Sequence, residues 1–357
     1  MNTHKQSYQG RASSPARRSI AALLAVCALV ASQAAATLPV AAAQAPAQVP
    51  IVIQFSHVVT ADTPKGRAAL KFKELAEART AGRVRVEVYP NSQLYKDREE
   101  MDALKLGAAQ MRAPSLSKLA GFGGGDFEVF DLPFLFKDHA AYHKVVDGSI
   151  GAQLLRKLEA RGIKGLAYWD NGFKVFTANR PLESVHDFQG LKIRVQASRT
   201  LVQQMRQLGS EPSISPLINV YEALRKGDLD GEENTPVNIY SQRLHEVQSS
   251  LTLSRHGYLA YAVIVNKAFW DRLPTDIRST LEGAMRDATA YQNGLAETAN
   301  TRALEQLKAS AKLTIHIPDA EQLVQWREAL EPVYLASQAW ITPGLIAAIK
   351  LATGAPP

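Results

Sequence analysis

The feature that most constrains the fold is a helical pattern that runs without a break from Pro274 to about Ala311. Apolar side chains recur in it at a spacing of three or four residues. These positions are Ile277, Leu281, Ala284, Ala288, Tyr291, Leu295, Ala299 and Ala303. Such a helix is roughly 55 Å long, more than the width of one small domain, so we expect it to bridge two lobes. Because these positions are rich in Ala rather than Leu or Ile, packing against the protein's own body is favoured over a coiled coil.

Before this helix, segments typical of strands alternate with segments typical of helices. Residues 51–55 form a short apolar run, and residues 84–89 alternate between apolar and polar side chains. A helical pattern lies between them, with Pro64 in its first turn and Gly82 after its end. This alternation predicts an α/β fold, and a length of 357 residues suggests two domains or one domain with a large annex.

Three later segments have the sequence patterns of a helix, a strand and a loop. Residues 138–161 have the pattern of one helix. Residues 163–169 are typical of a strand, which we expect to end at Asp170-Asn-Gly172. The glycine-rich stretch 121–125 predicts a flexible loop.

The N-terminus has the pattern of a secretory signal peptide. Arg17 and Arg18 precede an apolar run at residues 20–31, and small residues continue to Ala43. A membrane anchor is the alternative, but the run is about a dozen residues, short of the roughly 20 that span a bilayer. A twin-arginine route fits the residues after the arginine pair less well. We expect residues 1–43 to be removed, with Cys27, the only cysteine, and the remainder to reside outside the cytoplasm.

The charge of the chain argues against nucleic acid as a partner. The formal net charge is +7, and residues 1–43 contain four basic residues and no acidic one. Without that segment the charge falls to +3, too little for the basic surface that nucleic acid binding needs.

Motifs for catalysis, metals or cofactors are missing from the sequence. It contains no phosphate-binding loop, no dinucleotide fingerprint and no nucleophile elbow. His139 and His143 lie four residues apart, which favours a solvated helix face over a metal site. The acidic residues at 228–233 lack the spacing of a calcium loop. We expect a protein that is not an enzyme and has no cofactor; a secreted hydrolase or lyase is the rival interpretation.

Basic and amide side chains near strand ends suggest a receptor for carboxylates. Arg194 shares one strand face with Lys192 and Gln196, and Lys174 lies on the preceding extended segment. Residues 231–236, which include Asn234, resemble a helix start with free backbone N–H groups. A guanidinium fork matches two carboxylate oxygens, and an ammonium supplies a point charge. The simpler alternative is an arginine exposed to solvent.

Seven stretches make the chain resemble the substrate-binding proteins of tripartite ATP-independent periplasmic (TRAP) transporters, in their dicarboxylate-binding branch. They cover nearly all of the chain after the signal segment. They are Phe55-Ser-His-Val-Val-x-x-Asp-Thr-Pro-Lys-Gly66, Val88-Tyr-Pro-Asn-Ser-Gln-Leu94, Ala113-Pro-Ser-Leu-Ser-Lys118, Asp131-Leu-Pro-Phe-Leu-Phe136, Gly165-Leu-Ala-Tyr-Trp-Asp-Asn-Gly-Phe-Lys174, Gly190-Leu-Lys-Ile-Arg-Val-Gln196 and Asp230-Gly-Glu-Glu-Asn-Thr235.

The resemblance implies a two-lobed, hinged fold of the type II periplasmic-binding-protein kind, with a long helix along both lobes. Lobe I would comprise residues 44–171 and about 260–299, and lobe II residues 172–259 and about 300–350. By the same resemblance, one group of residues would clamp a ligand carboxylate and another would meet the far end of the ligand from the opposite lobe. The first group is Arg194, Lys174 and Asn234, and the second is His57, Ser115 and Lys118.

The implied function is capture of a small organic acid by hinge closure, most simply a C4-dicarboxylate such as malate, succinate or fumarate. The receptor would be a monomer and would deliver its ligand to the small and large permease subunits. The alternative is a sensing protein that binds a monocarboxylate, aromatic acid or sugar acid and presents it to a sensor kinase.

The chain departs from the branch pattern at several positions, which leaves the exact acid open. Arg112 places a charge in a strand that is usually apolar, and residues 121–125 replace a more polar loop. Leu217 stands where an aromatic residue often covers the ligand, and Pro236 where a tryptophan is common.

Overall fold

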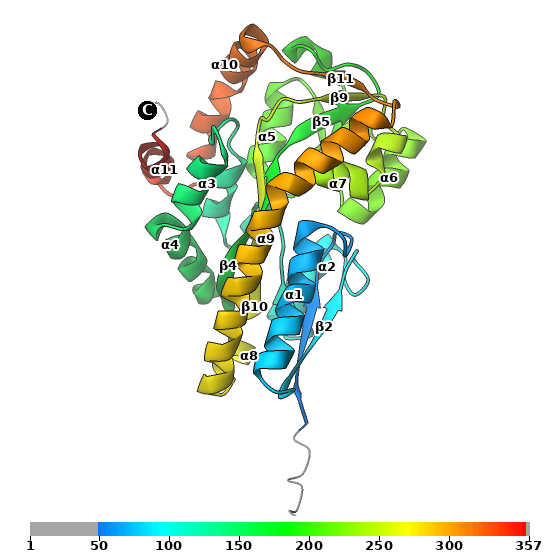
Figure 1. The fold of residues 1–357 in the computed structure, drawn as a ribbon. Coiled ribbons are helices and arrows are strands. Elements are labelled where there is room, and N and C mark those ends of the chain that lie inside the picture. The colour runs from blue at the N-terminus through cyan, green and yellow to red at the C-terminus, as the bar shows by residue number, and fades with distance from the viewer. Residues whose placement is uncertain (1–48, 355–357) are drawn as a thin grey trace, which may run out of the picture. The chain divides into compact units, whose positions relative to one another are not determined.

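The computed structural model describes residues 49–354, so the predicted signal peptide lies outside the described residues. Its strands form a five-stranded sheet of order β2-β1-β3-β10-β4 and a six-stranded sheet of order β11-β9-β5-β8-β6-β7. We call the parts built around these sheets the first lobe and the second lobe (Figure 1). The predicted α/β fold is confirmed.

The first lobe has a mixed sheet covered by helices. Its strands are β1 (Ile51–Ser56), β2 (Val84–Tyr89), β3 (Met111–Arg112), β4 (Ile163–Phe173) and β10 (Tyr258–Asn266). Its helices are α1 (Pro64–Arg79), α2 (Asp97–Lys105) and α8 (Lys267–Asp271). β1 runs parallel to β2 and β3, whereas β10 is antiparallel to β3 and β4. Helix α1 begins where predicted, because the Thr63 hydroxyl accepts a hydrogen bond from the Gly66 N–H. Phe55, Phe72 and Trp169 pack ring against ring in the core beneath it.

The second lobe is built from short strands and the helices that connect them. The strands are β5 (Val175–Ala178), β6 (Lys192–Val195), β7 (Glu211–Ile214), β8 (Gly231–Asn234), β9 (Ser250–Thr252) and β11 (Thr314–His316). The helices are α5 (Arg199–Gln207), α6 (Leu217–Lys226), α7 (Pro236–Ser241) and α10 (Ala320–Ser337), with 3-10 turns η4 (Val185–Phe188) and η5 (Leu244–Glu246). The chain changes sheet between Phe173 and Val175, and again between Thr252 and Tyr258. Lys174 therefore lies at a crossing between the lobes.

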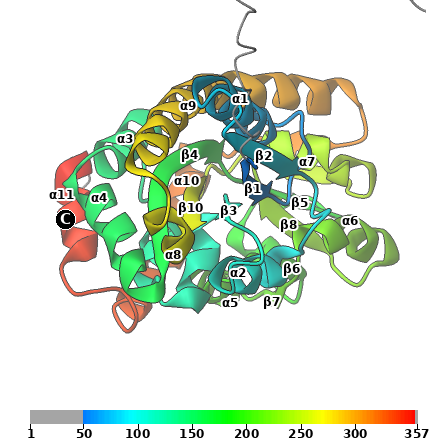
Figure 2. The ribbon, with the colours of Figure 1, turned by 90° about the horizontal axis from the view of Figure 1, so that it is seen from below.

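The long helix is present as α9 (Thr275–Ala309), 35 residues in length. It lies beside α1 in the first lobe and beside α7 in the second (Figures 1 and 2). Its predicted apolar positions Ile277, Leu281, Ala284 and Ala288 are buried. The prediction of a helix that extends along both lobes is confirmed. None of the helices within residues 49–354 has the combination of length and hydrophobicity that crossing a membrane requires.

The expected helix over residues 138–161 is wrong, because the structure has three segments there. They are α3 (His139–Val146), α4 (Ser149–Lys157) and the 3-10 turn η3 (Leu158–Arg161). A Cβ atom at Gly151 would lie 2.2 Å from the Val146 carbonyl oxygen, so a glycine at this position lets α4 start hard against the end of α3. The last helix, α11 (Leu345–Thr353), packs on α3.

Two other expectations also need correction. Strand β4 does not end at Asp170 but continues to Phe173, because a bulge at Asn171 and φ +134° at Gly172 let Gly172 pair with Leu259 of β10. The stretch 121–125 is not one loop: it joins two 3-10 turns, η1 (Leu116–Phe122) and η2 (Gly125–Asp131).

Candidate functional site

Polar side chains from both lobes line a narrow cavity of about 10 Å³, roughly the space of one water molecule. The first lobe contributes Lys65, Ser115, Lys118 and Tyr261. The second lobe contributes Arg194, Gln196, Asn234 and Asn238. Three of these side chains are cationic, so the arrangement suits an anion. Four of the six residues predicted to bind a ligand, Arg194, Asn234, Ser115 and Lys118, are brought together here.

Arg194 is buried on β6, with 1% of its surface exposed. Its Nε and Nη2 atoms donate hydrogen bonds to the Ser215 carbonyl oxygen, over 3.0 and 2.9 Å. Its Nη1 atom is buried and has no hydrogen-bond partner among the described residues. The alternative of a solvent-exposed arginine is therefore wrong. A buried donor without a partner is costly, and a carboxylate oxygen would satisfy it.

Lys118 of η1 forms an ion pair with Asp97, the first residue of α2. The second carboxylate oxygen of Asp97 accepts a hydrogen bond from the Leu217 N–H over 2.7 Å, at the start of α6. Although burial opposes it, the Lys118 charge holds the pKa of Asp97 below its usual value. Asp97 therefore connects the two lobes, which the sequence did not indicate.

Lys65 in the first turn of α1 is a further cation, and it is not among the six predicted ligand-binding residues. Its Nζ donates to the Ala113 carbonyl oxygen over 3.1 Å and lies 3.7 Å from the centre of the Tyr261 ring. Burial, followed by repulsion from Lys118, lowers the pKa of Lys65 to about 7. Burial also raises the pKa of the nearby Glu100 to about 7. The sequence could have pointed to Lys65, because this residue lies within the first of the seven stretches that resemble the family.

Ser115 and Asn234 take part in hydrogen bonds at opposite sides of the cavity. The Ser115 hydroxyl donates to the Gln196 side-chain oxygen over 2.5 Å, which is a second contact between the lobes. The Asn234 oxygen accepts from the Thr235 N–H and the Asn238 amide. Asn234 ends strand β8, and the helix start lies one step later, with Thr235 before Pro236. The expected helix start at residues 231–236 is thus a strand followed by a helix.

Lys174 lies outside the cavity lining, inside the protein where the lobes cross. Its Nζ is 2.7 Å from Glu233 Oε2 and 3.7 Å from Asp131 Oδ1. Although burial opposes it, the Lys174 charge keeps the pKa of Glu233 below its usual value. One acidic residue of β8, Glu233, is thus the buried counter-ion of Lys174.

His57 is also buried outside the cavity lining, although its neighbours Val58 and Val59 line it. Neither ring nitrogen has a hydrogen-bond partner in the described part of the chain. Burial, followed by the charge of Lys65, lowers the pKa of His57 to about 3, so the ring is neutral at physiological pH. A neutral ring supplies no charge to an anion.

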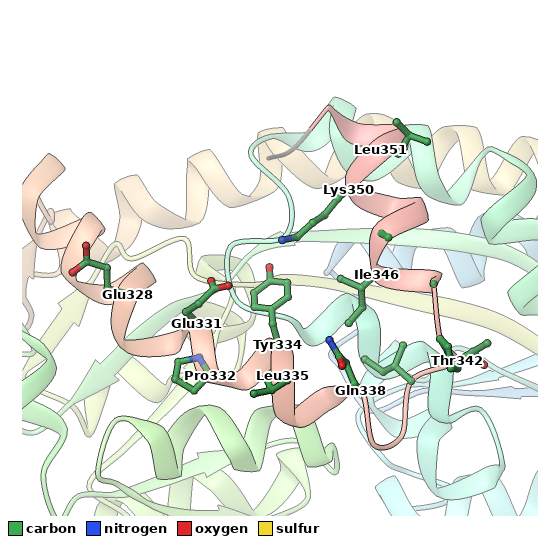
Figure 3. A pocket seen from close by; sticks show the side chains of 14 residues that line it. Glu328, Glu331, Pro332, Tyr334, Leu335, Gln338, Thr342, Ile346, Lys350 and Leu351 are labelled. Carbon is green, nitrogen blue, oxygen red and sulfur yellow. The ribbon is translucent and has the colours of Figure 1, made fainter. Parts of the chain in front are cut away.

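A larger hollow, of about 1110 Å³, lies between α10 and α11 (Figure 3). Its lining is mainly apolar and includes the acidic pair Glu328 and Glu331. Lys350 is its one basic lining residue, and its Nζ lies 4.9 Å from the centre of the Tyr334 ring. A hollow lined by two carboxylates, with a single basic residue that already contacts an aromatic ring, does not suit an organic acid. The volume of a hollow therefore does not by itself identify the binding site.

The chain is similar to known proteins in both sequence and structure. The profile of the family described as bacterial extracellular solute-binding protein, family 7, matches residues 55–339. The C4-dicarboxylate-binding periplasmic protein DctP of Rhodobacter capsulatus is 54% identical over 304 residues, which cover 85% of this chain and 91% of that protein.

Two solved structures share the fold over most of the chain. A TRAP periplasmic solute-binding protein from Shewanella oneidensis, with bound succinate, has a TM-score of 0.84 and 40% identity, covering 85% of this chain and 100% of that one. A TRAP periplasmic solute-binding protein from Pseudomonas aeruginosa PAO1, with bound L-malate, has a TM-score of 0.78 and 40% identity, covering 80% of this chain and 100% of that one.

Proposed function

Because this chain belongs to the bacterial extracellular solute-binding proteins of family 7, we propose that it captures a C4-dicarboxylate between its two lobes and delivers it to a TRAP permease. The resemblance drawn from the seven sequence stretches is confirmed at the level of the family. The family consists of receptors rather than enzymes, in accord with the lack of a catalytic motif.

The observation that carries the proposal is the unpaired Nη1 of Arg194 in a cavity with two more cations. We assign Arg194 to one ligand carboxylate, with the Asn234 amide beside it. Lys65, Lys118 and Ser115 face the cavity from the first lobe, and we assign them to the second carboxylate. Cationic groups on both lobes match a ligand with a carboxylate at each end, whereas a monocarboxylate would leave one set without a ligand carboxylate.

Lys174 and His57 have other roles in this proposal. The ion pair of Lys174 with Glu233 anchors β8, the strand that ends in Asn234. We therefore regard Lys174 as a residue that positions the clamp, and His57 as a buried support for Val58 and Val59. The predicted contact of each with the ligand is replaced by an indirect role.

The cellular setting belongs to the same proposal. We propose export to the periplasm by means of residues 1–43, action as a monomer, and transfer of the ligand to the small and large permease subunits. For the lobes we keep the predicted ranges, 44–171 with about 260–299 and 172–259 with about 300–350. The changes of sheet near Lys174 and before Tyr258 support these boundaries.

Calorimetry and thermal unfolding with a panel of acids test the ligand class. The panel holds succinate, L-malate, fumarate, a C4-monocarboxylate, an aromatic acid, a sugar acid and a neutral sugar. A C4-dicarboxylate present at a hundred times its Kd should stabilise the fold by about 2.7 kcal/mol and raise the Tm. If only the sugar raises the Tm, the carboxylate class is wrong; if only the sugar acid does, the alternative of another carboxylate replaces the C4 assignment.

Transport and sensing use the same closure, so a separate measurement distinguishes them. Proteoliposomes that contain the permease subunits should accumulate labelled succinate only when this protein is added. Failure to drive uptake, together with ligand-dependent binding to a sensor kinase, would favour the sensing alternative.

A further inference from the structure

Two histidines and an aspartate form a compact cluster on the first lobe, away from the polar cavity. His139 and His143 lie one turn apart on α3, and Asp170 lies on β4. Each offers one ligand atom, and these atoms all lie within 4.8 Å of one another. Among residues 49–354 this is the one group of three such side chains. The expectation that the histidine pair is a solvated helix face is therefore wrong, because the pair turns toward a buried carboxylate.

The distances in the cluster are close to those around a metal ion. Asp170 Oδ2 lies 2.8 Å from His143 Nε2 and 3.4 Å from His139 Nε2. Two ligand atoms at the usual distance from a tetrahedral Zn²⁺ ion, about 2.0–2.1 Å, are about 3.3 Å apart. Small rotations of the side chains would thus admit an ion between them.

Each histidine is held by its other nitrogen. His143 Nδ1 lies 2.7 Å from Asp147 Oδ2, and His139 Nδ1 lies 2.7 Å from the Tyr258 hydroxyl. With Nδ1–H donated to these oxygens, both Nε2 atoms face Asp170, and the Nε2–H of His143 donates a hydrogen bond to Asp170 Oδ2. Loss of the Nε2 protons leaves a lone pair on each ring for a metal ion. Oxygen partners of this kind fix the ring orientation of histidines that bind metals.

Asp170 supplies an independent sign that a ligand is needed. Its side chain is 1% exposed, and its Oδ1 atom is buried with no hydrogen-bond partner in the described part of the chain. Its backbone is fixed by two hydrogen bonds with the Gln292 side chain on α9, over 2.8 and 2.6 Å. A rigid carboxylate with a spare oxygen is a suitable metal ligand.

An ion can reach the cluster from solvent. The His139 and His143 side chains are 37% and 21% exposed. His139 also lines a hollow of about 480 Å³ between the end of β4, α7 and α9. A water molecule could complete four-fold coordination from this side.

We propose that His139, His143 and Asp170 bind one divalent transition-metal ion, with Zn²⁺ as the preferred ion. Two imidazoles and one carboxylate are borderline ligands, which suit Zn²⁺ and not Ca²⁺ or Mg²⁺. The ion replaces any proton on the Nε2 atoms and neutralises the buried carboxylate. It joins α3 to β4, three residues before the chain enters the crossing between the lobes. This site is separate from the proposed acid-binding cavity.

The test uses the full chain without a histidine tag, and with Cys27→Ser in every preparation to remove the only thiol. After treatment with a chelator, the protein is dialysed against Zn²⁺, and bound metal is measured by elemental analysis and by competition with a chromophoric chelator. We expect one ion per chain. His139→Gln and His143→Gln should each lower the affinity at least tenfold, and Asp147→Asn should lower it by about 10- to 100-fold through loss of ring orientation.

The control is His186→Gln, which changes an exposed histidine on η4 and should leave Zn²⁺ binding unchanged. Succinate binding by each variant shows that the fold is intact. The absorption spectrum of bound Co²⁺ provides a direct readout of tetrahedral ligation, which a purely structural ion pair would not give. Absence of Zn²⁺ binding by the parent protein, or binding of parental affinity by both histidine variants, would overturn the proposal.

Discussion

Arg194 combines full burial with a donor that has no partner among the described residues, so we expect ligand binding to depend most on this residue. Replacing it with Ala leaves a ligand carboxylate inside the protein without its partner. We expect Arg194→Ala to lose at least a thousandfold in affinity for succinate, about 4 kcal/mol, by calorimetry. Arg194→Lys should also bind poorly, because it loses the fork.

The matched control is Arg206→Ala, which removes an exposed arginine from the neighbouring helix α5. It should bind succinate as the unaltered protein does. Binding of normal strength by either Arg194 variant would exclude this residue from the clamp.

We expect the affinity for the ligand to depend on pH through Lys65 and Glu100. Burial places the pKa of both groups at about 7, and they are surrounded by Lys118, Asp97 and His57. A bound anion favours the charged lysine and the neutral glutamic acid, so each group gains a proton on binding. Affinity for succinate should therefore rise as the pH falls from about 8.5 to 6.5, by up to tenfold per pH unit for each proton.

Calorimetry in buffers of different ionisation enthalpy counts these protons directly. Glu100→Gln should take up fewer protons than the unaltered protein, because one of the two groups is gone. An affinity that stays constant over this range, or rises with pH, would contradict this assignment of Lys65 and Glu100.

Among the elements, the end of β4 depends on a glycine against the long helix. Gly172 has φ +134°, and a Cβ atom there would lie 2.9 Å from Asn300 Nδ2 on α9. Asn300 donates to the Asn171 carbonyl oxygen and accepts from the Val237 N–H, so it joins β4 to α7. We expect Gly172→Ala to lower the free energy of unfolding by about 1–3 kcal/mol in urea titrations.

Gly294→Ala on the same helix is the control, since a Cβ atom there meets nothing within 4 Å. It should stabilise the protein by about 0.5–1 kcal/mol, because Ala loses less conformational freedom than Gly in a helix. If the two variants are equally stable, β4 tolerates a side chain at residue 172 next to α9, and the prediction is wrong.

At the scale of the whole molecule, two hydrogen bonds join the lobes beside the polar cavity. Asp97 reaches the Leu217 N–H at the start of α6, and Ser115 reaches Gln196. A hydrogen bond to a charged group is worth about 1.5–3 kcal/mol. Asp97→Ala should therefore release succinate about 10- to 100-fold faster in stopped-flow fluorescence, with a smaller change in the association rate.

Asp97→Asn keeps an acceptor for the Leu217 N–H and should restore slow release in part. Asp102→Ala removes an exposed carboxylate from the same helix and should leave release unchanged. If Asp97→Ala releases succinate at the original rate, this contact does not hold the lobes together.

Local patterns in the sequence were enough to predict most of the fold. The alternation in β2, the Thr63 cap of α1 and the apolar spacing of α9 depend on neighbours within one or two turns. Such signals are readable without the rest of the chain. The break between α3 and α4 was missed, because it depends on how closely Gly151 approaches Val146.

The candidate site, too, could be predicted from the sequence only in part. The sequence by itself predicted a role for Arg194, because the polar strand face that it shares with Lys192 and Gln196 and the family motif around it are both local. Only the tertiary structure decided that Lys65 faces the cavity and that Lys174 pairs with Glu233 instead. It also placed Asp170 against two histidines that the sequence showed merely as a spacing. The physical reason is that burial and charge pairing are set by segments far apart in the chain, which meet only when both sheets and α9 have packed.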